Sequence, residues 1–146
     1  MRPAPGGRAR TGVIGHCLCR RVRIEVPAPP DRVGICNCRL CRGSGAAWGY
    51  YDPAAVRVDG AVADYTREDL DDPWLVLHFC PRCGSATHYT ASAAHALDRI
   101  GVNTRLFVQD ELDGVEVTYQ DGRCVFEADD TFIETGTGRI GDGKAF

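Results

Sequence analysis

The sequence lacks any long apolar segment. No run among its 146 residues approaches the roughly 20 apolar residues that a membrane-spanning helix needs. The first ten residues are rich in Pro, Gly and Arg and contain no apolar core of a secretory signal. We therefore expect no membrane-spanning segment and a cytoplasmic location.

An excess of positive charge is also missing. The chain has 17 Lys and Arg against 20 Asp and Glu, which gives a formal net charge of −3. Proteins that bind nucleic acids usually present a basic surface on a basic domain. The basic residues 1–10 and the acidic stretch 59–72 are short and are expected to be solvated. The charge pattern therefore gives no support for a nucleic-acid partner.

Helical periodicity is scarce, with signals for only one or two turns at residues 66–70 and 106–112. The prevailing pattern is the alternation typical of strands, in which Val22, Ile24 and Val26, for example, share one face. Segments with this alternation, or with the continuous apolar character of a covered strand, are 11–17, 22–26, 74–79 and 85–90.

Two Asp-Gly pairs predict hairpins, because Asp-Gly suits the two positive φ angles of a type I′ turn. One hairpin is expected at 55–65, around Asp59-Gly60. The other is expected at 115–127, around Asp121-Gly122.

The chain shows no internal repeat and no linker, and its length suits one domain with its own core. We predict a single, mainly β domain over residues 11–136. A flexible basic tail is expected at 1–10 and a flexible Gly-rich tail at 137–146.

Cysteine, by contrast, is abundant and clustered. In a reducing compartment such cysteines bind metal or act in catalysis instead of forming disulfides, although a disulfide scaffold is the competing interpretation. Seven of the eight cysteines fall into three groups: Cys17 and Cys19; Cys36, Cys38 and Cys41; Cys80 and Cys83.

The first and third groups have the spacing of metal-binding pairs. Cys17 and Cys19 would lie on the same face of a strand. Cys80-Pro-Arg-Cys83 suits a tight turn between two strands, and Gly84 would allow a positive φ there. A redox dithiol is the alternative, but such motifs begin a helix, and the sequence after Cys83 resembles a strand.

Thiolate ligands favour zinc, copper(I) or iron–sulfur clusters, and tetrahedral zinc is the simplest occupant. Two closed sites need eight ligands, one more than the seven clustered cysteines. One interpretation assigns four of them to a closed, structural zinc site: Cys17, Cys19, Cys80 and Cys83. The remaining three would hold a second zinc with an open position, as catalytic sites do: Cys36, Cys38 and Cys41. Alternatively Cys124 or a histidine completes the second site, or the second site stays empty.

Cys124 stands alone in a predicted strand, where a cysteine usually behaves as a small buried apolar residue. His78 lies two residues from Cys80 and could approach the metal. For all four histidines an ordinary structural role is favoured: His16, His78, His88 and His95.

With these motifs the sequence resembles the glutathione-dependent formaldehyde-activating enzyme family, whose domain is shared with centromere protein V. The resemblance covers about residues 11–126 and includes a less specific match at 102–107. Three main motifs carry it, and their order and separation also match the family. They are Gly-His-Cys-Leu-Cys at 15–19, Cys-Asn-Cys-Arg-Leu-Cys-Arg-Gly-Ser-Gly-Ala at 36–46 and Phe-Cys-Pro-Arg-Cys-Gly-Ser at 79–85.

The resemblance implies a β-tent fold of packed antiparallel sheets with zinc-binding cysteine knuckles. It implies a structural zinc on the first and third cysteine pairs and a three-ligand zinc on the central motif, up to two zinc ions per chain. The implied activity is that of a carbon–sulfur lyase, which interconverts S-hydroxymethylglutathione with glutathione and formaldehyde. The chain departs from the family pattern at Arg20, where the first motif usually continues with Gly.

The leading hypothesis is therefore a zinc-dependent carbon–sulfur lyase acting on a small thiol, glutathione in the family. Zinc on the central motif would bind the thiol as thiolate and lower its pKa. His78, Asn103 and Arg105 are acid–base candidates by position and polarity alone. The alternatives are a non-catalytic zinc-stabilised binding module and a zinc-ribbon nucleic-acid binder, which the acidic balance disfavours.

Overall fold

The computed structural model describes residues 12–144, which form eleven strands and little helix, as the alternating pattern predicts. A three-stranded sheet has the order β1-β2-β5, and an eight-stranded sheet has the order β11-β10-β3-β4-β9-β8-β7-β6. The strands are β1 (Val13–His16), β2 (Arg23–Val26), β3 (Arg32–Cys36), β4 (Trp48–Tyr51), β5 (Arg57–Asp59), β6 (Ala63–Thr66), β7 (Leu75–Phe79), β8 (Ala86–Ala91), β9 (Ile100–Asn103), β10 (Glu116–Asp121) and β11 (Ile133–Arg139).

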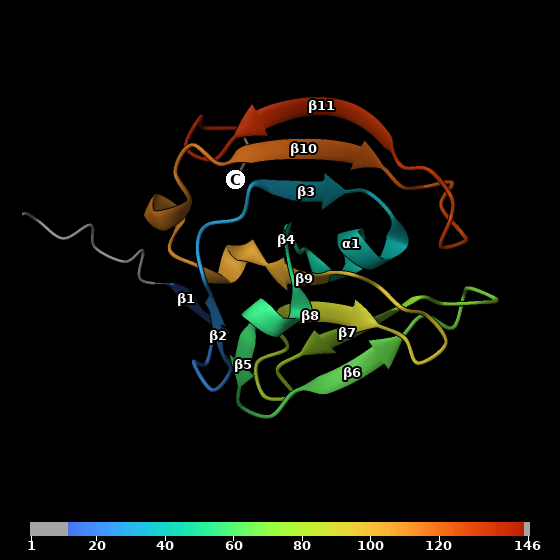
Figure 1. The fold of residues 1–146 in the computed structure, drawn as a ribbon, viewed down its shortest axis with the longest axis horizontal. Helices are drawn as coiled ribbons and strands as arrows, with labels where there is room; N and C mark the ends of the chain where they lie inside the picture. Colours follow the sequence, from blue (N-terminus) through green and yellow to red (C-terminus); the bar gives the residue numbers. More distant parts are fainter. Residues whose placement is uncertain (1–11, 145–146) are drawn as a thin grey trace, which may run out of the picture.

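The large sheet folds over on itself. Figure 1 shows β11, β10 and β3 as one layer and β8, β7 and β6 as another, with β4 running between the two. Neighbouring strands of this sheet are antiparallel, except that β3 and β10 pair in parallel. The expected packed antiparallel sheets are therefore present, with this one parallel pair as an addition, because a long crossover brings β10 back beside β3 in the same direction.

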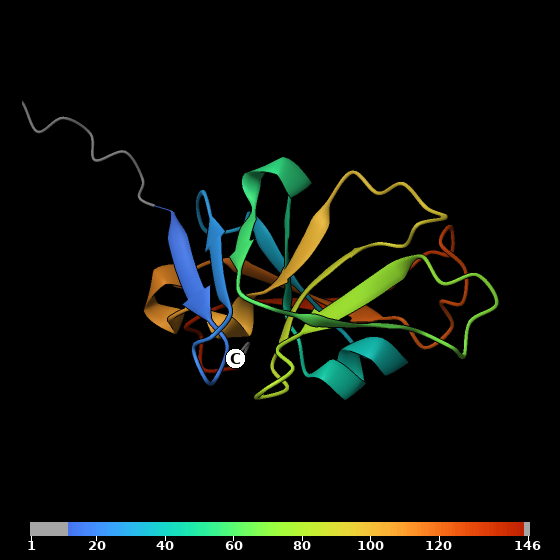
Figure 2. The ribbon, with the colours of Figure 1, turned by 90° about the horizontal axis from the view of Figure 1, so that it is seen from below.

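The three-stranded sheet and three long loops lie at opposite ends of the molecule. Figures 1 and 2 both show β1, β2 and β5 at one end, and the loops that follow β6, β8 and β10 gathered at the other. These loops therefore come together although they are far apart in the sequence.

The predicted apolar face of β2 forms part of the core. Val22 and Ile24 are 0% exposed and Val26 is 1% exposed, and they pack with Val33, Val102 and other apolar residues. Fully burying each such side chain contributes about 1.5–3 kcal/mol. The alternation of this strand thus fixes which of its faces points inward.

Both predicted hairpins are wrong. The segment around Asp59-Gly60 joins β5 to β6, but these two strands do not pair with each other. Instead β5 pairs with β2, and β6 pairs with β7. The second hairpin was expected to return along residues 123–127, but these residues form a loop. The strand that pairs with β10 on this side is β11. In that loop the Asp130 carboxylate accepts hydrogen bonds from the backbone of Phe126 and Glu127, which replace ladder bonds.

The longest helix in the described residues is α1 (Arg39–Ser44), which the sequence did not predict. The helical signal at 106–112 is in part correct, because η3 (Gln109–Leu112) is a 3₁₀ turn, whereas residues 66–70 contain no helix. The two other short turns are η1 (Pro53–Ala55) and η2 (Thr104–Leu106). Within residues 12–144, no helix is long and apolar enough to cross a membrane.

The sequence-based domain limit at residue 136 falls inside β11, which continues to Arg139. Beyond the strand, Ile140 is 1% exposed and belongs to the core cluster. The tail expected at residues 1–10 lies outside the described residues.

Candidate metal centres and the adjoining cavity

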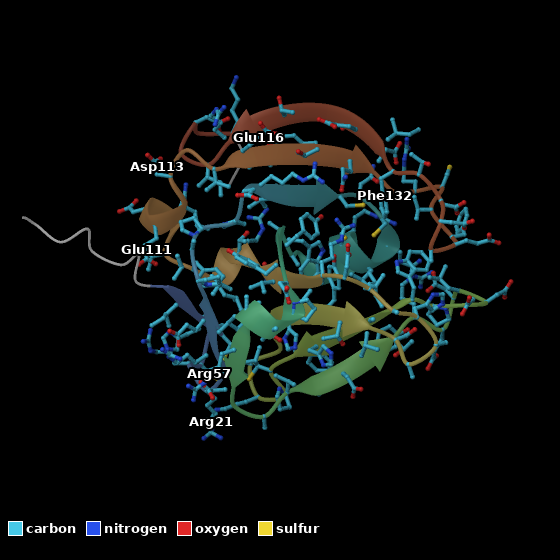
Figure 3. The ribbon with its side chains drawn as sticks, viewed as in Figure 1. Arg21, Arg57, Glu111, Asp113, Glu116 and Phe132 are labelled. Carbon is cyan, nitrogen blue, oxygen red and sulfur yellow. The ribbon has the colours of Figure 1, made fainter. Side chains whose placement is uncertain are left out.

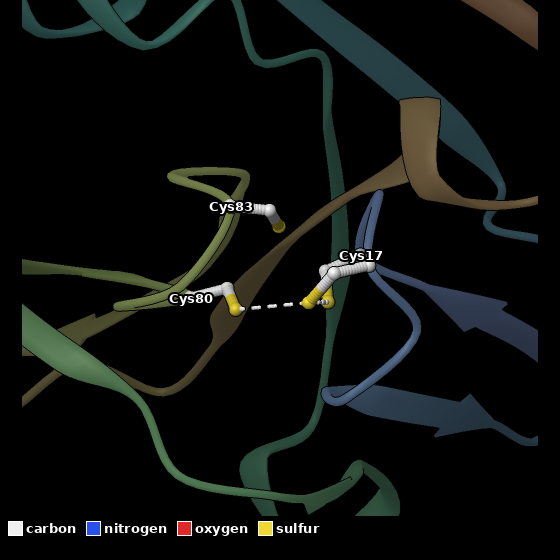
Figure 4. A group of neighbouring side chains, drawn as sticks. Cys17, Cys80 and Cys83 are labelled. Atoms are coloured by element: carbon white, nitrogen blue, oxygen red, sulfur yellow. Dashed lines mark hydrogen bonds between the residues drawn. The ribbon is translucent and has the colours of Figure 1, made fainter.

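Four cysteine sulfurs converge where the β1–β2 turn meets the β7–β8 turn. Cys17, Cys19, Cys80 and Cys83 each offer a sulfur, and these atoms all lie within 4.8 Å of one another. The distances are 3.7 Å from Cys17 Sγ to Cys19 Sγ and 3.7 Å from Cys19 Sγ to Cys80 Sγ. Figure 4 shows Cys80 and Cys83 on one turn facing Cys17 on the other. We refer to these residues as the four-cysteine cluster.

The four-cysteine cluster has the dimensions of a tetrahedral zinc site. A zinc–sulfur bond of about 2.3 Å places the corners of the tetrahedron about 3.8 Å apart, close to the two sulfur distances above. All eight cysteines are free thiols, and the separations far exceed a disulfide bond. The donor set therefore fits zinc, and a disulfide scaffold is excluded.

Local backbone geometry shapes both turns. Gly84 has φ +77°, as the sequence predicts, and its N–H donates to the Cys80 carbonyl. Arg20 occupies the corresponding left-handed conformation, φ +67°, in the first turn. This conformation explains why glycine is usual there, because a side chain with a Cβ is strained in it.

Ser85 connects the two turns, a role that the sequence analysis did not predict for it. Its hydroxyl accepts from the Leu18 N–H at 3.1 Å and lies 3.2 Å from Cys83 Sγ. Hydrogen bonds from the Ser85 hydroxyl and backbone lower the pKa of Cys83 to about 5. The thiolate that a metal requires is therefore favoured at this position.

The second cluster, which we call the three-cysteine cluster, forms where β3 leads into α1. Cys36 ends β3, Cys38 caps α1 and Cys41 lies within it, and their sulfurs are within 4.8 Å of one another. The backbone supports the arrangement, because the Cys38 N–H donates to Cys36 Sγ at 3.3 Å and the Cys41 N–H to Cys38 Sγ at 3.5 Å.

Negative charge in the three-cysteine cluster concentrates on Cys38. Hydrogen bonds from the Cys36 and Cys41 thiols lower the pKa of Cys38. Hydrogen bonds to Cys36 and Cys38 raise the pKa of Cys41. The three sulfurs thus share protons, and a cation would be needed for all three to be thiolates together.

Two contacts hold the three-cysteine cluster from outside. The Trp48 indole N–H donates to Cys41 Sγ at 3.3 Å, while the Trp48 ring packs edge-on against Tyr89. On the other side the Asn37 side chain accepts from the Gly122 N–H at 2.9 Å, so that Gly122 lies against Cys36.

A cavity of about 180 Å³ opens beside the three-cysteine cluster. Its wall includes all three of that cluster's cysteines and none of the four in the other cluster. The rest comes from both layers of the folded sheet and from the loops that follow β6, β8 and β10. Phe132, on the last of these loops, is seen near the end of β10 in Figure 3.

Two tyrosines line the cavity, Tyr50 and Tyr89. Tyr50 lies over Gly34 and Tyr89 over Gly101, positions where a Cβ would collide with the phenol rings. Burial raises the pKa of Tyr50 and also that of Tyr89. Both phenols are therefore neutral at physiological pH, and neither hydroxyl has a hydrogen-bond partner among residues 12–144.

Three arginines also line the cavity, whereas no Asp or Glu of the described chain does. Arg67 forms an ion pair with Asp69 at 2.6 Å, and its charge also acts on Cys38. Arg99 lies over the Tyr50 ring, 4.7 Å from its centroid, and Arg32 begins β3, the strand next to β4.

The three acid–base candidates taken from the sequence do not line the cavity: His78, Asn103 and Arg105. His78 bonds to Thr90 at 2.8 Å and stacks on His88. Asn103 is buried, where it accepts from the Ala47 N–H and donates to the Ala86 carbonyl. His78 and Asn103 therefore have structural roles.

The expectation that Cys124 is a small buried residue is wrong, because its side chain is exposed. It belongs to neither cysteine cluster. The segment that carries it is a loop and not the predicted strand, so its side chain has no sheet face to pack against.

The fold and the site define a class of protein: a mainly β domain with cysteine clusters suited to metal. Over residues 12–117 the chain matches the family model described as glutathione-dependent formaldehyde-activating enzyme, and it belongs to that family, which confirms the resemblance. It is also similar to the crystal structure of a Rhodobacter sphaeroides protein, with 28% identity and a TM-score of 0.52 over 64% of this chain and 85% of that chain. Comparison with curated proteins gives no match.

Proposed function

We propose that this protein is a zinc-dependent carbon–sulfur lyase acting on thiol–aldehyde adducts such as S-hydroxymethylglutathione. One observation carries the proposal: the three-cysteine cluster lines a cavity and the four-cysteine cluster does not. A three-thiolate site beside a cavity has room for an external ligand, which is the property that distinguishes catalytic from structural zinc sites.

The family membership and the donor sets support two zinc sites with different roles. Cys17, Cys19, Cys80 and Cys83 would hold a structural zinc that contributes folding energy. Cys36, Cys38 and Cys41 would hold the second zinc, which when bound supplies a Lewis-acidic position where a substrate thiol becomes a thiolate.

The reaction itself is a simple addition. In the synthetic direction the substrate sulfur bonds to the aldehyde carbon, the π electrons of the C=O bond move to oxygen, and the thiol proton ends on that oxygen. In the lyase direction the carbon–sulfur bond breaks and the proton returns to sulfur. No oxidant or reductant is needed.

The chain's own groups suit these proton movements. The neutral hydroxyls of Tyr50 and Tyr89 are available to donate a hydrogen bond to the aldehyde oxygen as charge develops on it. The apolar wall, including Trp48, Leu75 and Phe132, limits the access of water. We therefore assign proton positioning to the two tyrosines and not to His78.

The test compares interconversion of S-hydroxymethylglutathione with glutathione and formaldehyde, measured by exchange NMR spectroscopy on zinc-loaded protein. We expect wild type to accelerate exchange and Cys38→Ser to reduce it to the uncatalysed rate with the fold retained by thermal unfolding. Cys124→Ser is the matched control, because that thiol is exposed and outside both clusters.

Full activity in Cys38→Ser would refute the assignment of the three-cysteine cluster. No acceleration by the wild type with any thiol–aldehyde adduct would favour the alternative, a non-catalytic zinc-stabilised module.

A further inference from the structure

Arg32 and Arg99 both line the cavity beside the three-cysteine cluster. Within residues 12–144, no carboxylate forms an ion pair with either guanidinium. The third cavity arginine, Arg67, differs because it is neutralised by Asp69. Two unpaired positive charges that line one cavity repel each other, and a bound anion would relieve that repulsion.

The sheet brings the two arginines to the same place. Arg32 is the first residue of β3, Arg99 directly precedes β9, and β4 with Tyr50 lies between these strands. Both charges act on the Tyr50 phenol, and Arg99 also stacks on its ring. An anion at this point would meet two guanidinium groups and a phenol hydroxyl, each able to donate a hydrogen bond.

The three cysteines line the same cavity from the other end of β3, where Cys36 leads into α1. A ligand that occupies the cavity therefore has a sulfur-binding end and an anion-binding end. Guanidinium groups recognise carboxylates through paired, charge-assisted hydrogen bonds. The ligand that matches both ends carries a thiol and a carboxylate.

The cavity also limits the size of this ligand. Its volume is about 180 Å³, and an engineered protein cavity of about 150 Å³ takes up benzene. A mercaptocarboxylate such as 3-mercaptopropionate has as many heavy atoms as benzene. A tripeptide such as glutathione is several times larger and would have to extend out of the cavity.

We propose that the preferred thiol is a short mercaptocarboxylate, whose sulfur lies at the three-cysteine cluster and whose carboxylate binds between Arg32 and Arg99. This inference rests on the proposed function and narrows its substrate class. The carboxylate supplies binding energy remote from the reacting carbon and fixes the orientation of the sulfur.

The experiment uses cobalt(II)-substituted protein, in which the cysteine thiolates already give a charge-transfer absorption band and a further thiolate at the metal increases it. We would titrate the protein with 3-mercaptopropionate, with its uncharged amide and with glutathione. The carboxylate should bind about tenfold to a hundredfold more tightly than the amide, the range expected for a hydrogen-bonded charge.

Arginine variants locate the anion site. Arg32→Gln and Arg99→Gln should each reduce the preference for carboxylate over amide about tenfold or more. Arg57→Gln is the control for net charge, because Arg57 is exposed and lies at the other end of the molecule from Phe132 (Figure 3). The comparison of carboxylate and amide on the wild type needs no variant to fold.

The outcomes separate the two proposals. Equal binding of carboxylate and amide, or tighter binding of glutathione than of 3-mercaptopropionate, would overturn this inference and leave the proposed thiol site intact. No charge-transfer change with any thiol would overturn the open metal site, and with it the proposed function.

Discussion

Replacing Trp48 with Phe removes the indole N–H that donates to Cys41 Sγ at 3.3 Å. Phe retains an aromatic ring, so that most of the edge-on contact with Tyr89, 5.0 Å between ring centroids, is kept. The substitution therefore acts mainly on the charge of one sulfur in the three-cysteine cluster.

The magnitude follows from the kind of hydrogen bond that is lost. Trp48 is 3% exposed, so water does not replace the indole N–H at the sulfur. A buried hydrogen bond to a charged acceptor contributes about 1.5–3 kcal/mol. Outer-shell partners of metal ligands typically change metal affinity about 10-fold to 100-fold, which agrees with that energy. We expect Trp48→Phe to weaken zinc binding at the three-cysteine cluster by this factor.

The assay is competition for zinc with a chromophoric chelator, which resolves the two sites if their affinities differ. Affinity at the four-cysteine cluster should stay unchanged in Trp48→Phe. Trp74→Phe is the matched control, because Trp74 also lines the cavity but donates no hydrogen bond to a sulfur in the described structure. Equal affinities for wild type and both variants would refute the role of the N–H···S bond.

Three further substitutions test the scaffold. Arg20→Gly should raise the unfolding free energy of the zinc-loaded protein by about 0.5–1 kcal/mol in denaturant titrations, because φ +67° strains a non-glycine residue; Arg21→Gly should give no gain. Asn103→Ala should lower it by about 3 kcal/mol, since buried backbone groups lose their partners; an unchanged value would contradict the structural role. Burial lowers the pKa of His88 to about 4. Between pH 6.5 and 4 the imidazole is therefore protonated in the unfolded chain but not in the folded one, and the unfolding free energy should fall as the pH drops through this range. His88→Asn should flatten this part of the pH profile, and a profile identical to wild type would argue against a neutral, buried imidazole.

Local sequence signals predicted several strands and the turn that positions one of the cysteine pairs. The alternation of Val22, Ile24 and Val26 predicts a buried face because side chains alternate along any strand. The Cys80–Cys83 turn with its positive-φ Gly84 is likewise a local property. Such features depend on neighbours within a few residues, which the sequence displays directly.

Strand pairing was less predictable where long-range packing overrides a local turn signal. The Asp59-Gly60 pair suits a hairpin, yet Val58 of β5 lies opposite Ile24 of the buried β2 strand. This pairing places β5 beside the core, and the local turn preference cannot compensate for that burial. The parallel pairing of β3 with β10 is set by similar long-range contacts.

The cavity could not be predicted because its wall combines residues that are far apart in the sequence. Arg32, Tyr50 and Arg99 become neighbours only through the order of β3, β4 and β9 in the sheet. One signal was available in the sequence: Trp48-Gly-Tyr50 places two aromatic side chains on one strand face beside a glycine. That face lines the cavity.

The most direct test is the zinc content per chain of the purified protein and of Cys36→Ser. Two zinc ions in the wild type, falling to one in the variant, are the predicted result. One zinc ion in both proteins would contradict a second, open metal site at Cys36, Cys38 and Cys41.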